Sequence, residues 1–260
     1  MMNILCIGDI VGRPGREALI KVLPALKEEH AIDFTIANGE NAAGGCGILP
    51  KQADEIFKAG VDMITLGDHV WDKTEVNGYL DANPRMVRPA NFPDGAPGRG
   101  WRVAEAPNGI RVGVINLLGR SFMRYNVLCP FRTLDQTLQE VSSLAPVIIL
   151  DMHAETTSEK VAMGHYADGR VAAVFGTHTH IQTADETILP KGTAYITDLG
   201  MSGPYDSVIG QNKEKILKRF LTSLPQKFEV AQGAAKICGA VISVDEKTGR
   251  AERIVRFQQG

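Results

Sequence analysis

The sequence predicts an α/β fold in which helices cover a largely parallel sheet. In the first third of the chain, short apolar runs typical of buried strands alternate with segments whose apolar residues recur at helical spacing. Residues with metal-binding side chains follow most of these apolar runs. Hydrophobic residues make up 44% of the chain, enough for a sizeable core. An alternating strand and helix order is typical of a parallel sheet with helices on its faces.

Three strands and two helices are expected in the first third of the chain. The strands cover residues 4–7, 33–37 and 61–66. A helix is expected over residues 15–29, and Pro24 should kink or split it. A second helix should begin at Pro50 and end near residue 59, because proline is well tolerated in a first helical turn.

The rest of the chain predicts hairpins, buried strands and two helices. Asn108-Gly109 separates two strand-like runs, which is a strong hairpin signal. Strands are expected at 147–150 and 171–175, further hairpins within 187–197 and 237–257, and helices at 133–144 and 207–221. The last helix should turn Ile216, Leu217 and Phe220 inward. We expect a single domain over residues 1–260, with two packed sheets and the helices outside.

Composition excludes several classes of protein. The net charge of -2 and the 22% charged content argue against a disordered chain and against stable nucleic-acid binding. A small anionic substrate remains compatible if bound metals supply positive charge. No signal peptide is predicted, and no apolar run approaches the roughly 20 residues of a membrane-spanning helix. A homo-oligomer is compatible with this size, but no residue indicates its interface.

The cysteines favour a reducing compartment. Cys6, Cys46, Cys129 and Cys238 are widely spread and form no Cys-x-x-Cys pair. Free thiols are therefore expected, which is typical of a cytoplasmic enzyme.

Side chains that bind metals gather at the expected strand ends. They lie in Gly8-Asp9, Gly39-Glu40-Asn41, Gly67-Asp68-His69, Asp151-Met152-His153, the pair His178 and His180, and Asp198. The carboxyl ends of strands in an open α/β sheet converge on one crevice. Carboxylate, amide and imidazole groups without a thiolate indicate a metal site suited to hydrolysis.

Each of these residues has a simpler interpretation when taken alone. A single acid after a strand is often a turn or a helix cap, and a single histidine is usually structural. The combination favours metal binding. His178 and His180 are two residues apart, so on an extended segment both rings would point to the same side and reach one centre.

The number of candidate ligands predicts two metals. They are Asp9, Glu40, Asn41, Asp68, His153, His178 and His180, more than one tetrahedral zinc needs. Two metals that share a carboxylate can clamp an anionic ester and hold a bridging hydroxide for in-line attack. Iron, manganese or zinc would suit these ligands.

In their order along the chain, the motifs resemble those of the metallophosphoesterase (calcineurin-like) superfamily. More closely they resemble the YmdB-type phosphodiesterases of bacteria, through Gly-Asp-Ile-Val-Gly, Asn-Gly-Glu-Asn-Ala-Ala-Gly-Gly, Gly-Asp-His-Val-Trp-Asp and Gly-Thr-His-Thr-His. The resemblance spans residues 8 to about 210. It implies a four-layer α-β-β-α sandwich of two mixed sheets with a di-metal centre.

The resemblance also implies roles for the residues. Asp9, Glu40, Asn41 and His180 would hold one metal, and Glu40, Asp68, His153 and His178 the other, with Glu40 bridging. His69 would protonate the leaving oxygen as a general acid. The implied metals are iron first, with manganese or zinc as alternatives, and the implied substrates are small cyclic nucleotides such as 2′,3′-cyclic AMP.

Two positions depart from the superfamily motifs. Val11 stands where the first motif has a histidine, and the resemblance to YmdB-type proteins implies that Asn41 fills that vacancy. Asp68 stands where the third motif has asparagine, so tighter metal binding and slower turnover are expected. Two other functions therefore stay open: a phosphomonoesterase such as a nucleotidase, and a nucleotide-binding regulatory protein with little turnover.

Two further segments have open interpretations. The loop over residues 118–132 carries Arg120, Arg124 and Arg132, which would either meet a phosphate or base or lie in solvent. The turn at Asp198 would either line the pocket or serve only as a turn.

Overall fold

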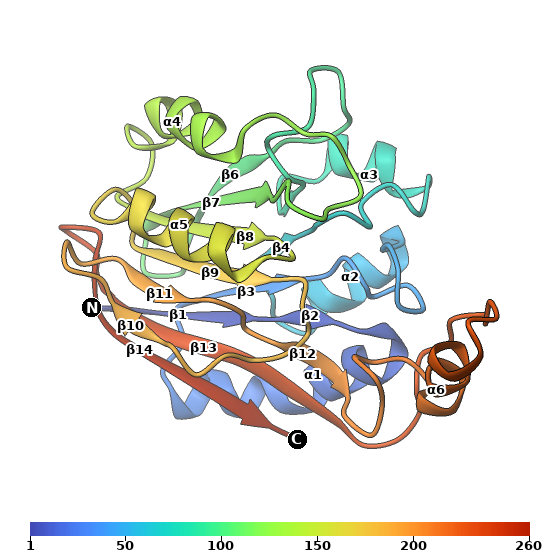
Figure 1. Ribbon diagram of the computed structural model, residues 1–260. Coiled ribbons are helices and arrows are strands. Elements are labelled where there is room, and N and C mark those ends of the chain that lie inside the picture. The colour runs from blue at the N-terminus through green and yellow to red at the C-terminus, as the bar shows by residue number, and fades with distance from the viewer.

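The computed structural model describes residues 1–260 as two β-sheets packed face to face, with helices on their outer sides (Figure 1). The larger sheet has eight strands: β2 (Asp9–Ile10), β12 (Met201–Pro204), β13 (Ala235–Asp245), β1 (Met2–Ile7), β3 (Phe34–Asn38), β4 (Met63–Thr65) and β5 (Met86–Val87) in spatial order, with β14 (Arg250–Gln259) pairing with β13. The smaller sheet has six: β10 (Thr187–Ile188), β11 (Ala194–Ile196), β9 (Ala173–Thr177), β8 (Val147–His153), β7 (Arg111–Leu118) and β6 (Trp101–Glu105). Both sheets contain parallel and antiparallel pairs.

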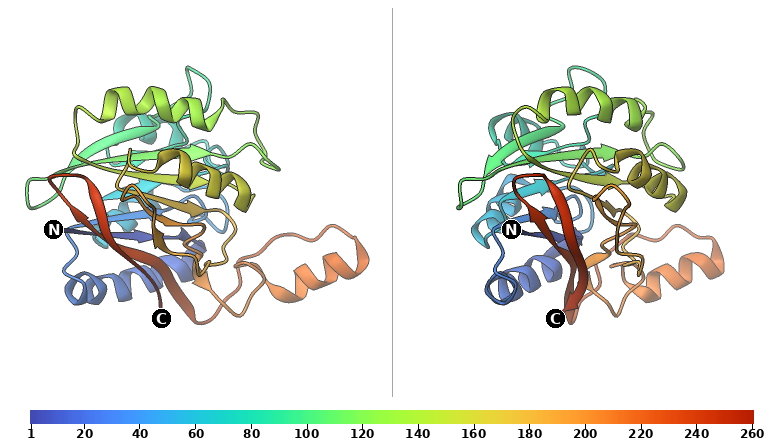
Figure 2. Two further views of the ribbon diagram at one scale, coloured as in Figure 1. Left: turned by 60° about the vertical axis from the view of Figure 1, so that its left-hand side comes forward. Right: turned by 90° about the vertical axis from the view of Figure 1, so that its left-hand side faces the viewer.

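The helices form the two outer layers. On the larger sheet lie α1 (Gly12–Glu29), α2 (Pro50–Lys58) and α3 (Val76–Ala82), and on the smaller sheet lie α4 (Pro130–Val141) and α5 (Thr157–Ala167). The sixth helix, α6 (Lys213–Thr222), projects from the body of the molecule (Figure 2). None of them has the length and apolar character needed to cross a membrane. The four-layer sandwich of two mixed sheets is confirmed.

Three hydrophobic cores hold these layers together. The central core has 22 buried residues and joins the sheets, with Ile4 and Ile36 from the larger sheet and Val114 and Ile149 from the smaller one. Cores of 21 and 15 buried residues lie between each sheet and its helices. The central strands are therefore covered on both faces, which explains their continuous apolar runs.

The parallel strands set the position of the polar loops that follow them. In the larger sheet β1, β3 and β4 are parallel neighbours, with Ile7 beside Ala37 and Ala37 beside Ile64. In the smaller sheet β7, β8 and β9 are parallel, with His153 beside Thr177. The carboxyl ends of each set therefore lie side by side, as the sequence predicts.

Helix α1 differs from its predicted form. It begins at Gly12 instead of residue 15, and Pro24 lies inside one helix of 18 residues without splitting it. Leu23 and Leu26 are both buried against the sheet on either side of the proline. Packing of the apolar face outweighs the hydrogen bond that proline removes.

The prediction for α6 was wrong in two respects. The helix begins at Lys213, where the Asn212 side chain accepts a hydrogen bond from the Lys215 backbone at 3.0 Å. Residues 207–211 are not helical. Leu217 and Phe220 do not face inward, since they are 54% and 78% exposed. Ile216, the third residue expected to face inward, is buried as predicted, at 6% exposure. Only part of the expected apolar face is therefore covered.

Several elements were not predicted. They are β2, β5, β12, α3 and α5. Three of these are strands of two to four residues, too short for a periodic pattern, and α5 has no clear apolar stripe. The expected strand over residues 147–150 continues to His153, which places that histidine inside the sheet.

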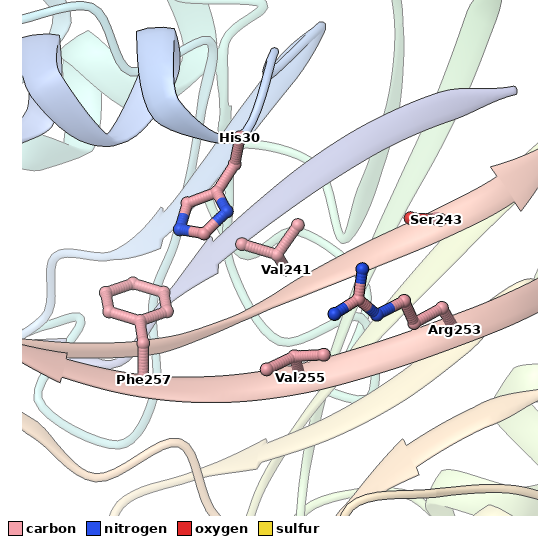
Figure 3. A pocket seen from close by; sticks show the side chains of 6 residues that line it. All are labelled: His30, Val241, Ser243, Arg253, Val255 and Phe257. Atoms are coloured by element: carbon pink, nitrogen blue, oxygen red, sulfur yellow. The ribbon is translucent and has the colours of Figure 1, made fainter.

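A small hollow of about 60 Å³ lies on the outer face of β13 and β14, beside the end of α1 (Figure 3). His30, Val241 and Phe257 are among its lining residues. None of the predicted metal ligands lines this hollow.

Candidate metal centre

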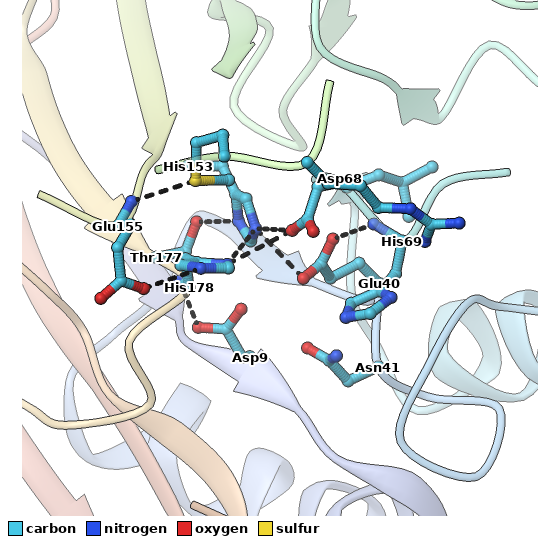
Figure 4. A network of polar contacts seen from close by, with 12 residues as sticks. Asp9, Glu40, Asn41, Asp68, His69, His153, Glu155, Thr177 and His178 are labelled. Atoms are coloured by element: carbon cyan, nitrogen blue, oxygen red, sulfur yellow. Dashed lines mark hydrogen bonds and ion pairs between the residues drawn. The ribbon is translucent and has the colours of Figure 1, made fainter. Parts of the chain in front are cut away.

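The seven side chains predicted as ligands lie together at the strand ends. Figure 4 labels all of them except His180. Asp9 is in β2, Glu40 and Asn41 follow β3, Asp68 follows β4, His153 ends β8, and His178 and His180 follow β9. Two sheets therefore contribute to one site. A pocket of about 560 Å³ opens above it, and Glu40, Asn41, His178 and His180 are among its lining residues.

Four of these residues form a tight cluster. One ligand atom from each of Glu40, Asp68, His153 and His178 lies within 4.8 Å of the other three. His153 Nε2 is 3.1 Å from Glu40 Oε1, 3.2 Å from Asp68 Oδ1 and 3.1 Å from His178 Nδ1. Two carboxylates and two imidazoles at these separations can hold one divalent cation.

The other three ligands lie beside this cluster. His180 Nε2 is 3.3 Å from Asn41 Oδ1. Asp9 Oδ2 accepts a hydrogen bond from the His178 backbone at 3.1 Å, while Asp9 Oδ1 is buried without any partner. A buried carboxylate oxygen without a partner is costly, and a cation would satisfy it. These donors fit a second metal.

Outer partners set the orientation of all three histidines. His153 Nδ1 is 2.8 Å from Thr177 Oγ1, His178 Nε2 is 3.1 Å from a Glu155 oxygen, and His180 Nδ1 is 2.8 Å from the Ile209 carbonyl. Each ring can donate its proton to that partner and keep the other nitrogen for a metal. This pairing is typical of metal-binding histidines.

Thr177 extends this arrangement to a buried acid. Its hydroxyl donates to Asp151 Oδ1 at 2.7 Å, which leaves its own oxygen as the acceptor for His153. Burial raises the pKa of Asp151 to about 6, although the charge of His153 and the hydroxyls of Thr65 and Thr177 oppose the rise. Asp151 therefore supports the ligands and does not face the pocket.

The electrostatics keep two of the ligand carboxylates ionised. Burial would raise the pKa of Asp68, but before a cation binds, hydrogen bonds from His153 and His178 outweigh burial and hold that pKa well below its usual range. Burial also opposes ionisation of Glu40, and the charge of His153 again lowers its pKa. Ionised carboxylates are the form that binds cations.

His69 lies on the pocket wall next to these ligands. Its Nδ1 is 2.7 Å from Asp72 Oδ2, and Asp72 Oδ1 accepts from Arg124 at 2.6 Å. Burial would lower the pKa of His69, but the charge of Glu40 and the hydrogen bond to Asp72 raise it. Of the three loop arginines, only Arg124 reaches the site in this way. The other two, Arg120 and Arg132, have exposed side chains.

The segment that carries His178 and His180 is not extended. Strand β9 ends at Thr177, and the two histidines have φ angles of 102° and 65°. The prediction that an extended segment would point both rings to the same side was therefore wrong, although both residues reach the site. His178 joins the cluster around His153, and His180 turns towards Asn41. Left-handed backbone of this kind is unfavourable for residues other than glycine.

A buried ion pair holds this segment in place. Lys160 Nζ lies 2.6 Å from Asp198 Oδ2 and donates to the Thr177 carbonyl at 2.7 Å, and both charged side chains are 1% exposed. Asp198 also accepts hydrogen bonds from the backbone and hydroxyl of Thr179. Asp198 therefore does not line the pocket but anchors the turn between the two histidines.

Sequence reasoning gave no role to several residues around the site. Contacts with distant segments give roles to Thr177, Glu155 and Lys160. For Asp72, the contact that gives it a role is with a near neighbour in the chain, His69. Asp72 lies in the motif Gly-Asp-His-Val-Trp-Asp, three residues after His69, and that spacing was the only available signal. A lysine within α5 gives no sign that it is buried.

Comparison with known proteins identifies the family of this chain. A model of the family described as YmdB-like protein matches residues 5–257. The chain belongs to the YmdB-like family. One relative in the family is the 2′,3′-cyclic-nucleotide 2′-phosphodiesterase of Bacillus subtilis (strain 168), 50% identical over 98% of this chain and 96% of the relative. A putative phosphatase/phosphodiesterase of Mycoplasma genitalium is 35% identical over 99% of this chain and 92% of its own length.

Two solved structures share the fold of this chain. A hypothetical protein from Thermus thermophilus superposes with a TM-score of 0.92 at 43% identity, covering 99% of this chain and 98% of its own. A phosphatase from Mycoplasma pneumoniae also gives a TM-score of 0.92, at 34% identity, with 99% and 92% covered. The family expected from the motifs is confirmed.

Proposed function

We propose that this YmdB-like protein is a metal-dependent phosphodiesterase that hydrolyses small cyclic nucleotides of the 2′,3′-cyclic AMP type. The observation that carries the proposal is the cluster of Glu40, Asp68, His153 and His178 beneath an open pocket. The relative from Bacillus subtilis is named for this activity and is half identical to the chain.

The proposed ligand sets follow the two groups of donors. One metal takes Asp9, Glu40, Asn41 and His180, and the other takes Glu40, Asp68, His153 and His178. Glu40 is shared between them. We propose iron first, with manganese or zinc as alternatives, because mixed imidazole and carboxylate ligands suit all three. Bound at these ligands, two cations would supply the positive charge that stabilises an anionic phosphodiester and activates water.

His69 is the proposed general acid. Asp72 holds Nδ1 of its ring at 2.7 Å, which leaves Nε2 free within the pocket. Because the pKa of His69 is raised, its ring stays protonated up to a higher pH than an ordinary histidine. A proton at Nε2 can then pass to the leaving oxygen when the ester bond breaks.

A phosphomonoesterase is the second candidate, since two of the relatives are named as putative phosphatase/phosphodiesterase. The purified protein with manganese should hydrolyse bis-p-nitrophenyl phosphate and 2′,3′-cyclic AMP faster than p-nitrophenyl phosphate. A preference for the monoester would favour the second candidate. Binding of 2′,3′-cyclic AMP without any turnover would instead indicate a regulatory nucleotide-binding protein.

Glu40→Gln tests the metal centre directly. Loss of the shared carboxylate should abolish hydrolysis of 2′,3′-cyclic AMP and reduce bound metal to below one ion per chain, measured by elemental analysis. Glu17→Gln, an exposed acid on α1, is the matched control and should leave both unchanged. Full activity in the Glu40 variant would refute the assignment.

Two further expectations belong to this proposal. A cytoplasmic location is supported by the four free cysteines, which suit a reducing compartment. A single domain over residues 1–260 is supported by the central core, which draws on strands from both halves of the chain.

A further inference from the structure

One wall of the pocket above the metal ligands is apolar and exposed. Ile209 and Phe228 line it, and their exposed fractions are 49% and 56%. The rest of the lining is mostly polar and includes His69, Asp72 and Glu155. Large apolar side chains that stay exposed inside a polar pocket favour a ligand with an apolar surface of its own.

Ile209 is held next to a metal ligand in a strained conformation. Its φ angle is 46°, in the left-handed region that β-branched residues rarely adopt. Its carbonyl lies 2.8 Å from His180 Nδ1, which fixes the backbone at this point. Glycine or asparagine would suit this backbone better, so the isoleucine side chain does not serve the local fold. Strain of this kind is typical of functional sites.

Phe228 lies near the end of the projecting segment that carries α6, and Ile209 lies just before its start. The segment that carries α6 leaves the body at Gln211 and returns at Val230, and these two residues pair as an isolated bridge. Ala231 donates its backbone hydrogen bond to the Gly210 carbonyl at 2.9 Å. The Arg219 guanidinium lies 5.0 Å from the centre of the Phe228 ring. The base of the projection thus brings both apolar side chains to the pocket.

We propose that Ile209 and Phe228 form the nucleobase subsite of this pocket, with the base stacked on the Phe228 ring. This inference rests on the proposed function, because it takes the phosphodiester to lie at the metal ligands beside His180. A nucleobase has a flat apolar face that stacks well on an aromatic ring, whatever the base. A pocket of about 560 Å³ has room for a mononucleotide. Ile209 and Phe228, at the base of the segment that carries α6, would then make the enzyme selective for nucleotides over other phosphodiesters.

The test compares a substrate that has a base with one that has none. Wild-type protein, Phe228→Ala and the control Phe220→Ala are assayed with manganese on 2′,3′-cyclic AMP and on glycerol 1,2-cyclic phosphate. Phe228→Ala should lower kcat/KM for 2′,3′-cyclic AMP by about tenfold, the usual effect of losing one stacked base, and leave the glycerol substrate unchanged. Phe220, 78% exposed on α6 and absent from the pocket wall, should have no effect when replaced.

Ile209→Asn separates a binding role from a structural one. Asparagine tolerates the left-handed backbone, so the melting temperature should stay equal or rise. The KM for 2′,3′-cyclic AMP should nevertheless rise several-fold, while the glycerol substrate is unaffected.

Three outcomes would overturn the subsite. Equal losses on both substrates would show a general structural effect. No loss on 2′,3′-cyclic AMP would show that the base binds elsewhere. A changed subunit count in Phe228→Ala with unchanged kinetics would assign the apolar wall to contact between chains. Wild-type protein that hydrolyses neither substrate would refute the proposed function itself, which is a distinct result.

Discussion

Asp68 gives the metal centre a negative charge that an asparagine at this position would not provide. Its Oδ1 lies 3.2 Å from His153 Nε2 and 3.3 Å from His178 Nδ1, at the centre of the cluster. An additional carboxylate should strengthen cation binding. It should also reduce the positive charge that bound cations would present to a phosphodiester, so we expect tighter binding at some cost in electrophilicity.

The contribution of His69 to the rate of hydrolysis should be larger for a substrate with a poorer leaving group. His69→Gln should reduce kcat on 2′,3′-cyclic AMP by about 10²–10⁴-fold, because an alkoxide needs a proton as it leaves. The loss on bis-p-nitrophenyl phosphate should be far smaller, since p-nitrophenolate leaves without one. Steady-state kinetics on both substrates checks this. Equal losses on the two would show that His69 does not act as the acid.

The loop after β9 shows how one element depends on another. His178 and His180 hold left-handed backbone that nothing in their own sequence favours. The Lys160–Asp198 pair, between α5 and the turn before β12, compensates by anchoring Thr177 and Thr179. Because both charges are buried, each needs the other, and loss of one leaves an uncompensated charge.

Replacement of Lys160 should therefore weaken metal binding without touching a ligand. Lys160→Met should lower the affinity for manganese about tenfold, measured by titration calorimetry, and should reduce the free energy of unfolding by about 3–5 kcal/mol. The exposed Lys218→Met is the matched control and should change neither. Lys160→Met combined with Asp198→Asn should recover part of the stability. Unchanged manganese affinity in a folded Lys160→Met protein would contradict the positioning role.

Across the whole molecule, the candidate metal centre lies between the two sheets. Asp9, Glu40 and Asp68 come from the larger sheet, whereas His153 and His178 come from the smaller one. The central core also holds the sheets together. A cation held by ligands from both sheets would be released on unfolding, so its binding to the folded state should add stability.

Metal removal should lower thermal stability measurably. Treatment with a chelator should lower Tm by roughly 10 °C, since saturation at about 1,000 times Kd stabilises by about 4 kcal/mol. Calorimetric scans before chelation, after it and after manganese is restored measure the shift. The Glu40→Gln variant should show little change in Tm when the chelator is added. Identical Tm values with and without metal in the wild-type protein would show that no cation links the sheets.

The sequence by itself determined the strand order of the first third, the four-layer class and the identity of the seven gathered side chains. Continuous apolar runs and a polar residue after each of them are local signals, and parallel neighbouring strands bring those polar residues to a common edge. Only the tertiary structure decided how those side chains are aimed. The buried Lys160, the outer partners of the histidines and the exposed face of α6 depend on contacts between distant segments. Their energies come from burial and pairing in space, which local patterns in the chain do not record.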